Sequence, residues 1–265
     1  LQRPRFVAVR EFGPGALIYH EGSRYQVTRV QLPPDSGGKL TTGKAMRCEG
    51  CGYHHPVQRK ADRCELCDQP LKGAITGLLH LHTVYTTKRE KISSDEEERR
   101  RAGFRVITSY RFQDLGDRLS RQDALVGDDE GTIARLHYGD SADVHRINLR
   151  RLRTKPDEPD GFWIDPVTGK WLNQQQAKNA VSDPTELPLV EEDGRERGMR
   201  QLVIPYVADR RNIAVLHLDE AVSKETALSL MYALERGIEA AFELEDVELT
   251  SELLPPDEGP RDRML

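Results

Sequence analysis

Four cysteines form two Cys-x-x-Cys pairs in this chain of 265 residues: Cys48 with Cys51, and Cys64 with Cys67. Zn²⁺ takes four ligands in a tetrahedron and binds thiolates well, and each pair can offer two sulfurs from one tight turn. The chain has no other cysteine, so four thiolates would fill every coordination position and leave none for water. The spacing therefore predicts one structural Zn²⁺ ion rather than a catalytic one.

Disulfides are the alternative use of four cysteines, and they are typical of secreted domains. We expect no secretory leader, which favours the metal. His54 and His55 follow the first pair closely and could compete as ligands, but a complete thiolate set favours roles beside the metal or on the surface. His80 and His82 share one side of an expected strand without an evident third ligand, so packing is favoured there.

Four arginines in the middle of the chain are candidates for nucleic-acid contact: Arg146, Arg150, Arg151 and Arg153. Basic and apolar residues alternate in this stretch, so a strand would present arginines on one face, where they could bind phosphates. A solvated strand face is the competing interpretation. The net charge of -5 argues against coating of nucleic acid by bulk positive charge, but it leaves a local basic strip open.

Three aromatic residues, Phe162, Trp163 and Trp171, stand in an otherwise polar stretch. They could stack on the bases of a single-stranded nucleic acid. Such side chains more often hold a hairpin together by cross-strand contact, and this second interpretation is favoured.

Alternation of apolar and polar residues predicts short strands within residues 5–30 and over residues 79–87, 104–112 and 132–152. Residues 202–207 and 213–218 have the same character. The expected fold is of the α+β class: a small, mainly antiparallel sheet with an inserted Cys₄ zinc ribbon or knuckle and a long C-terminal helix.

Two helices are expected. A short one should begin at Ser93 or Ser94 and end near Gly103. Ser223 can cap a long one that ends at Pro255 and Pro256. The residues expected on its buried stripe are Leu230, Met231, Leu234, Ile238, Ala241 and Phe242.

Composition suggests three parts. Residues 1–152 should form a β-rich domain that contains the zinc knuckle at 45–70. Residues 153–200 are rich in Pro, Asp, Glu, Gly and Gln, which predicts a polar, partly flexible insertion with a small hairpin. Residues 201–265 should complete the domain with strands and the C-terminal helix.

Several segments resemble the C-terminal region of bacterial superfamily 2 DEAD/DEAH-box helicases, the family named after mitomycin repair factor A and its zinc-binding domain. They are residues 2–6, 11–15, 18–22, 48–53, 92–98, 108–112, 227–237 and 245–255. Relatives of this region also occur in the DISARM anti-phage systems. The resemblance implies an accessory module of an ATP-dependent DNA helicase or translocase in DNA repair or phage defence. Its partners would be DNA and the motor domains, in cis or in another subunit.

No catalytic centre is recognisable in the sequence. Residues 38–45 lack the Ser or Thr of a complete P-loop, so ATP would bind only in the parent motor. Whether the whole protein is an enzyme stays open, and a protein-interaction scaffold without direct nucleic-acid contact is the alternative function. No apolar run approaches the ~20 residues that cross a bilayer. We expect a cytoplasmic segment of a longer protein, without membrane contact.

Overall fold

The computed structural model describes residues 1–32, 39–59, 61–89, 103–114, 116, 119–129, 131–155, 157–180, 199–245, 248–255 and 259–265. The chain divides into two compact units, each assembled from segments that are distant in the sequence. Unit 1 comprises Leu1–Ala45, Ile75–Ile107 and His145–Ala208. Unit 2 comprises Met46–Ala74, Thr108–Val144 and Asp209–Leu265.

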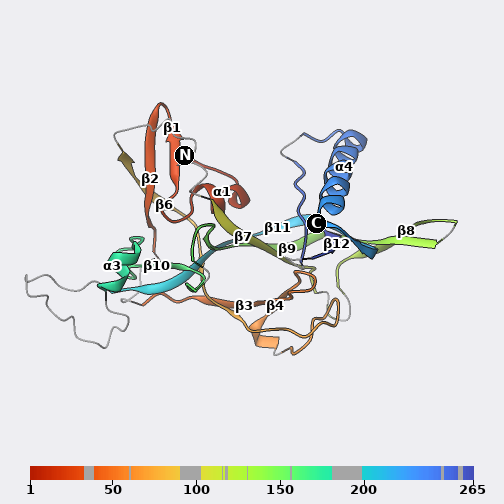
Figure 1. The fold of residues 1–265 in the computed structure, drawn as a ribbon, viewed down its shortest axis with the longest axis horizontal. Coiled ribbons are helices and arrows are strands. Elements are labelled where there is room, and N and C mark those ends of the chain that lie inside the picture. Colours follow the sequence, from red (N-terminus) through yellow and green to blue (C-terminus); the bar gives the residue numbers. More distant parts are fainter. Residues whose placement is uncertain are drawn as a thin grey trace, which may run out of the picture. The chain divides into compact units, whose positions relative to one another are not determined.

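A nine-stranded sheet dominates the described part of the chain (Figure 1). Its strand order is β4-β3-β5-β11-β9-β7, with β8 paired to β9 and with β10 and β12 paired to β11. β5 runs parallel to β11, whereas β3 is antiparallel to β5, so the sheet is mixed. The bounds are β3 Gly43–Arg47, β4 His54–Pro56, β5 Ile75–His80, β7 Phe104–Arg111, β8 Gln122–Asp128, β9 Gly131–Arg151, β10 Phe162–Ile164, β11 Gln201–Val222 and β12 Arg261–Met264. The expected small sheet is thus wrong in size.

A second, three-stranded antiparallel sheet consists of β1 (Leu17–His20), β2 (Ser23–Val30) and β6 (Val84–Arg89). β1 and β2, two of the short strands expected within residues 5–30, form a hairpin, and Glu21 and Gly22 between them both have positive φ. Two positive φ values give a turn whose twist matches that of the flanking strands. The single strand expected over residues 79–87 is instead divided between β5 and β6, which lie in different sheets.

Residues 5–11 were expected to begin a strand and instead form the helix α1 (Arg5–Glu11). The reason lies in the spacing of its apolar residues, because Phe6 and Val9 are three apart and both pack into one core cluster of unit 1. That spacing places them on one side of a helix. Residues 202–207 and 213–218, expected as two strands, belong to the continuous strand β11.

The core of unit 1 consists of two clusters of aliphatic side chains. One gathers buried residues from α1, β2, β5, β10 and β11 and from the segments that precede β3 and follow β5. The other gathers them from β3, β5, β9 and β11. The first contains Val9, Val30, Leu40, Leu79, Leu81, Ile164, Val203 and Val207. The second contains Ala45, Leu78, Ile147, Leu149 and Ile204.

His80 gives unit 1 a testable pH dependence. Its Nδ1 lies 2.9 Å from Nε2 of His82, and the ring of Tyr206 packs edge-on against it. Burial lowers the pKa of His80, and positive charge on His82, Arg5 and His145 lowers it further. The unfolded chain then binds a proton at His80 more readily than the folded chain does. The contribution of neutral His80 to the free energy of unfolding is therefore fully present above pH ~6.5 and is lost as the pH falls below it.

We therefore expect the free energy of unfolding to decrease between about pH 7 and pH 5, and to decrease less in His80→Asn. Urea unfolding at a series of pH values measures this difference. The same decrease in both proteins would show that His80 does not carry the effect.

Unit 2 contains α4 (Lys224–Phe242), a long helix that begins as expected at Ser223, whose Oγ accepts a hydrogen bond from the N–H of Thr226 at 3.1 Å. The helix ends at Glu243, which has a left-handed backbone, and not at the later prolines. It packs through Met231 against a cluster that also contains Ala134, Leu218 and Met264.

The predicted buried stripe of α4 is only partly correct. Met231 is buried, whereas Leu234, Ile238 and Phe242 are exposed by 38%, 37% and 71%. The helix instead buries Ala227 and Glu239, and Glu239 accepts a hydrogen bond from Arg236.

The remaining helices are short: α3 spans Gln174–Lys178, and a single 3₁₀ turn spans Val57–Arg59. The helix expected at residues 93–103 lies outside the described residues except for residue 103. Among the helices that the structure describes, none combines the length and the low polarity that a membrane-spanning helix requires.

Candidate functional site

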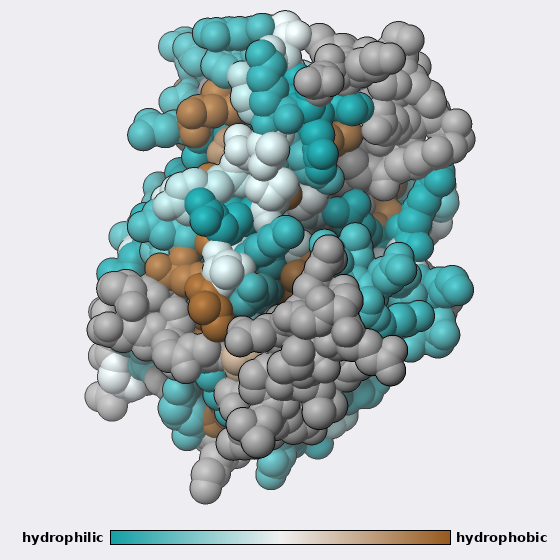
Figure 2. Space-filling model, turned by 90° about the vertical axis from the view of Figure 1, so that its left-hand side faces the viewer, coloured by the Kyte–Doolittle hydropathy of each residue, from teal (hydrophilic) through white to brown (hydrophobic). Residues whose placement is uncertain are grey.

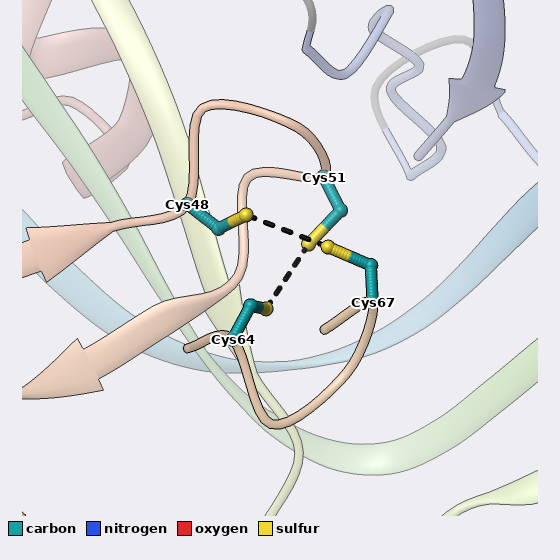
Figure 3. A group of neighbouring side chains, drawn as sticks. All are labelled: Cys48, Cys51, Cys64 and Cys67. Carbon is teal, nitrogen blue, oxygen red and sulfur yellow. Dashed lines mark hydrogen bonds between the residues drawn. The ribbon is translucent and has the colours of Figure 1, made fainter. Parts of the chain in front are cut away.

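The four predicted cysteines converge in unit 2, where their side chains point toward one another from two turns (Figure 3). All four Sγ atoms lie within 4.8 Å of one another. Sγ of Cys48 is 3.5 Å from that of Cys67, and Sγ of Cys51 is 3.6 Å from that of Cys64. A disulfide needs about 2.05 Å, whereas a tetrahedron with metal–sulfur bonds of ~2.3 Å has sulfurs about 3.8 Å apart. The group therefore fits one tetrahedral metal ion.

The first turn is held by its own backbone. The N–H of Cys48 donates to the carbonyl of Tyr53, and the N–H of Gly52 donates to the carbonyl of Cys48, both at 2.9 Å. The N–H of Gly50 lies 3.4 Å from Sγ of Cys48, where it stabilises a thiolate. Gly52 has a φ of 78°, and a Cβ there would lie 3.2 Å from Cδ of Pro255. Backbone conformation and close packing both favour glycine at this position.

The second turn repeats this pattern. The N–H of Cys64 donates to the carbonyl of Gln69 at 2.8 Å, the N–H of Asp68 donates to the carbonyl of Cys64 at 3.0 Å, and the N–H of Leu66 lies 3.4 Å from Sγ of Cys64. Asp68 takes the place of Gly52, with a φ of 58°. Asp is among the few residues that adopt this conformation readily. The two turns are thus near copies that present two sulfurs each.

Mutual contact changes the pKa values of Cys48, Cys51 and Cys64. A hydrogen bond with Cys48 raises the pKa of Cys64 to about 12 and raises that of Cys51 further. The pKa of Cys48 is lowered, because its sulfur accepts hydrogen bonds from Cys51 and Cys64. The thiolate of Cys48 therefore forms easily, whereas Cys51 and Cys64 keep their protons. A divalent cation is the group that allows all four to ionise together, since its charge offsets their repulsion.

The two histidines near the first turn lie beside the sulfurs or apart from them. His55 is fully buried, with Nε2 at 3.4 Å from Sγ of Cys64 and Nδ1 at 3.8 Å from a carboxylate oxygen of Glu65. Nδ1 of His54 lies 3.1 Å from Oγ of Ser109. His55 therefore contacts the sulfur of Cys64, and His54 lies apart, on Ser109.

An aromatic cluster packs next to the cysteines. Tyr53, Tyr110 and Phe112 are each 0% exposed, and their ring centroids lie 5.5 to 6.3 Å apart. The guanidinium of Arg111, in β7, donates to the carboxylate of Glu65 at 2.9 Å, which connects this strand to the second turn. The run of β-branched and aromatic residues at 104–112 was the only sign of this packing in the sequence.

A residue near the end of the described chain also holds the first turn. Nη1 of Arg263, in β12, donates to the carbonyl of Gly50 at 2.6 Å. Nothing in the sequence pattern indicated this contact, because the two residues are 213 positions apart. The cysteine turns are thus held by side chains from β7 and β12, two strands that are distant from each other in the sequence.

A separate groove of about 1070 Å³ lies within unit 1. Seven lysines and arginines and a single acidic residue, Glu158, are among the described residues that line it. Its walls come from β2, β6, β10 and α3 and from the segment that follows β9. The groove is therefore a concentrated basic site in a chain whose net charge is -5.

The four predicted arginines divide between this groove and other surroundings. Arg151 and Arg153 line the groove, whereas the described lining does not include Arg146 or Arg150. Arg150 pairs with Asp160 at 3.4 Å. The guanidinium of Arg146 lies 5.3 Å from the ring centroid of Phe6. Their role in nucleic-acid contact stays a prediction.

The three predicted aromatic residues all line the groove. Phe162 and Trp171 contact each other edge to face, with centroids 6.2 Å apart, across a turn in which Ile164 pairs with Trp171. Trp163 lies in β10, and the guanidinium of Arg200 sits 4.8 Å from its ring centroid.

The cysteine group and the groove are two places where the described chain concentrates chemically active side chains. The cysteine turns belong to unit 2, and the groove belongs to unit 1. Comparisons of the chain with protein-family models, with curated proteins and with solved structures found no match, so the resemblance to the helicase-associated region stays a prediction.

Proposed function

We propose that the chain is a zinc-stabilised accessory module of an ATP-dependent DNA helicase or translocase, which supports the motor and contacts DNA. The observation that carries the DNA contact is the groove of unit 1, where seven basic residues meet one acidic residue in a chain of net charge -5. Phosphate backbones are bound by such local clusters of Lys and Arg.

The zinc part of the proposal rests on the ligand set. Tetrahedral sites of four sulfurs hold zinc or iron, and four cysteines on two tight turns are typical of structural zinc ribbons. With four protein ligands the ion has no open position for a substrate, so its contribution is to hold the two turns in place. Elemental analysis of the purified chain is expected to give one zinc per chain, and iron in its place would overturn this part.

The helicase part rests on the segments that resemble the helicase-associated region. ATP binding and hydrolysis would belong to motor domains in cis or in a partner subunit, in DNA repair or in phage defence. The chain would then serve as the part that steadies the motor and holds the DNA that the motor moves.

Titration of the purified chain with labelled DNA at two salt concentrations tests the DNA contact. Each phosphate that a Lys or Arg neutralises releases counterions, so we expect the affinity to fall at least about tenfold between ~50 and ~200 mM salt. Arg151→Gln with Arg153→Gln should weaken binding of all sequences alike, because phosphate contacts carry no sequence information. Failure to bind at the lower salt concentration would contradict the DNA contact.

A protein-interaction scaffold without nucleic-acid contact is the second candidate, and the exposed side of α4 favours it. Leu234, Ile238 and Phe242 are spaced four residues apart and are exposed by 38%, 37% and 71%. Exposed apolar residues on one helix face are typical of a partner-binding surface. The scaffold is the better account if two results are obtained. The chain does not bind DNA, and Phe242→Glu abolishes its co-purification with a motor protein.

A further inference from the structure

We infer that the groove of unit 1 binds a single-stranded nucleic acid, with its phosphates on the basic wall and a base stacked at Trp163. This inference rests on the proposed DNA contact and deepens it by naming the form of the nucleic acid.

The excess of positive charge in the groove favours a polyanionic ligand. Among the described residues, Arg151, Arg153, Lys155, Lys170 and Lys178 line the groove without an ion pair to a carboxylate. The one acidic lining residue already accepts a hydrogen bond from a neighbouring glutamine. A row of phosphates would neutralise several of these cations at once, and each such contact releases counterions.

Arg151 is held in place before any ligand binds. Its Nη2 donates to the carbonyl of Pro14 at 2.7 Å, and a Cβ on residue 15 would lie 2.2 Å from that nitrogen, so only glycine permits the approach. The side chain stays accessible from the groove, yet surrounding atoms displace enough water to lower the pKa of Arg151. A fixed, partly desolvated guanidinium binds a phosphate oxygen more strongly than a freely hydrated one.

The aromatic residues add a contact that a double helix cannot use. The guanidinium of Arg200 lies over Trp163 at 4.8 Å, which forms a flat cationic surface in the groove. Unpaired bases stack on aromatic rings and on arginine planes regardless of sequence. In a duplex the same base faces are already stacked on their neighbours.

Shape also distinguishes the two forms. Duplex DNA is read by a helix or a β-ribbon that enters its groove, which requires a protruding protein element. Here the protein supplies the hollow, of about 1070 Å³, and an unpaired strand can lie inside it. Gln26 at its edge is oriented by two hydrogen bonds from Arg89, at 3.0 and 2.6 Å, and its amide offers polar atoms to a base.

The polarity of one face of the molecule is compatible with such a ligand. On the face shown in Figure 2, hydrophilic residues predominate among the coloured atoms and hydrophobic ones gather in small groups. A polar face of this kind suits a hydrated, charged strand better than an apolar protein partner.

Fluorescence anisotropy with the full chain of 265 residues tests the inference. The probes are a labelled thymidine oligonucleotide of about 16 nucleotides, its RNA counterpart and a duplex of the same length. Trp163→Ala should weaken binding of the single strand about fivefold or more, and Trp163→Phe should weaken it less. Arg151→Gln with Arg153→Gln should lower the slope of log affinity against log salt by about 0.7 for each lost contact.

Two matched variants control for charge and for aromatic surface. Arg3→Gln removes an exposed arginine of unit 1 that is outside the described lining, and Tyr232→Ala removes an exposed ring from α4. Both should bind the single strand as the unchanged chain does. Melting curves identify any variant that fails to fold, and Trp163→Phe then stands in for Trp163→Ala.

The outcomes separate the inference from the function on which it rests. Single-strand binding that exceeds duplex binding and depends on Trp163 supports both, and the RNA arm shows whether a 2′-hydroxyl is accepted. Duplex binding that is equal or tighter but still depends on Arg151 and Arg153 overturns the inference and leaves the DNA contact intact. Binding that none of the groove variants changes overturns the groove as the site of both. No binding of any probe overturns both.

Discussion

Cys48→Ser and Cys64→Ser are each expected to abolish metal binding and to unfold the two cysteine turns. Both side chains are buried, and each supplies one quarter of the ligand set. Binding of a structural zinc ion supplies about 10–16 kcal/mol in isolated zinc-finger peptides. Because unit 2 also has an aliphatic core of its own, we expect a loss above about 4 kcal/mol, at the upper end for a single substitution.

Metal content and thermal melting of each variant measure this effect. Glu49→Gln is the matched control, because Glu49 lies in the first turn yet is exposed, and its one ion pair within the described part of the chain is with Lys72 at 2.7 Å. It should keep the metal, and its free energy of unfolding should stay within about 0.5 kcal/mol of that of the unchanged chain. A serine variant that retains its metal and its melting curve would refute the structural role of the site.

Phe112→Ala should be the second most damaging substitution, with a loss of about 3–5 kcal/mol. The ring is 0% exposed and packs against Tyr53 and Tyr110. It also fills the space left by Gly139, where a Cβ would lie 2.6 Å from Cδ1 of the ring. Truncation leaves a cavity between the cysteine turns and β9, so the loss includes a cavity cost in addition to the lost burial.

Urea unfolding of the metal-loaded chain measures the loss, and Phe242→Ala provides the comparison within the same unit. Phe242 is 71% exposed, so its removal should change the free energy of unfolding by less than about 0.5 kcal/mol. Equal effects of the two substitutions would show that the aromatic cluster does not support the metal centre.

The cysteine centre could be predicted from the sequence because its signal is local. Each Cys-x-x-Cys pair forms its own turn, with Gly52 or Asp68 at the left-handed position that the turn needs. Bringing the two pairs together then requires only a short connection. The partners that hold the turns, such as Arg263, come from remote segments and leave no local pattern.

The large sheet could not be predicted, because pairing between distant strands has no local signal. β5 and β11 are parallel neighbours although more than a hundred residues separate them along the chain. The same limit applies to α1, where Phe6 and Val9 fit either a strand pattern or a helix face until the core cluster selects the helix.

The buried face of α4 was predicted only in part, for a related reason. Its apolar residues are spread widely enough to allow several rotations of the helix. Contact of Met231 with the cluster around Leu218 and Met264 selects the buried side of the helix. Ala227 is buried as well, whereas Phe242 is exposed.

The arginine strip shows how a strand separates neighbouring residues. Successive side chains in a strand point to opposite faces. Arg150 and Arg151 are adjacent in β9, so one pairs with Asp160 while the other lines the groove with Arg153. A sequence of basic residues alone could not show which of them share a surface.

X-ray absorption at the zinc edge of the purified chain tests the central claim, one structural zinc held by the four cysteines, most directly. Four sulfur neighbours at about 2.3 Å and no nitrogen or oxygen neighbour are the expected result. Neighbours at ~2.0–2.1 Å, the distance of a histidine or water ligand, would contradict the four-cysteine centre, as would a chain that carries no zinc.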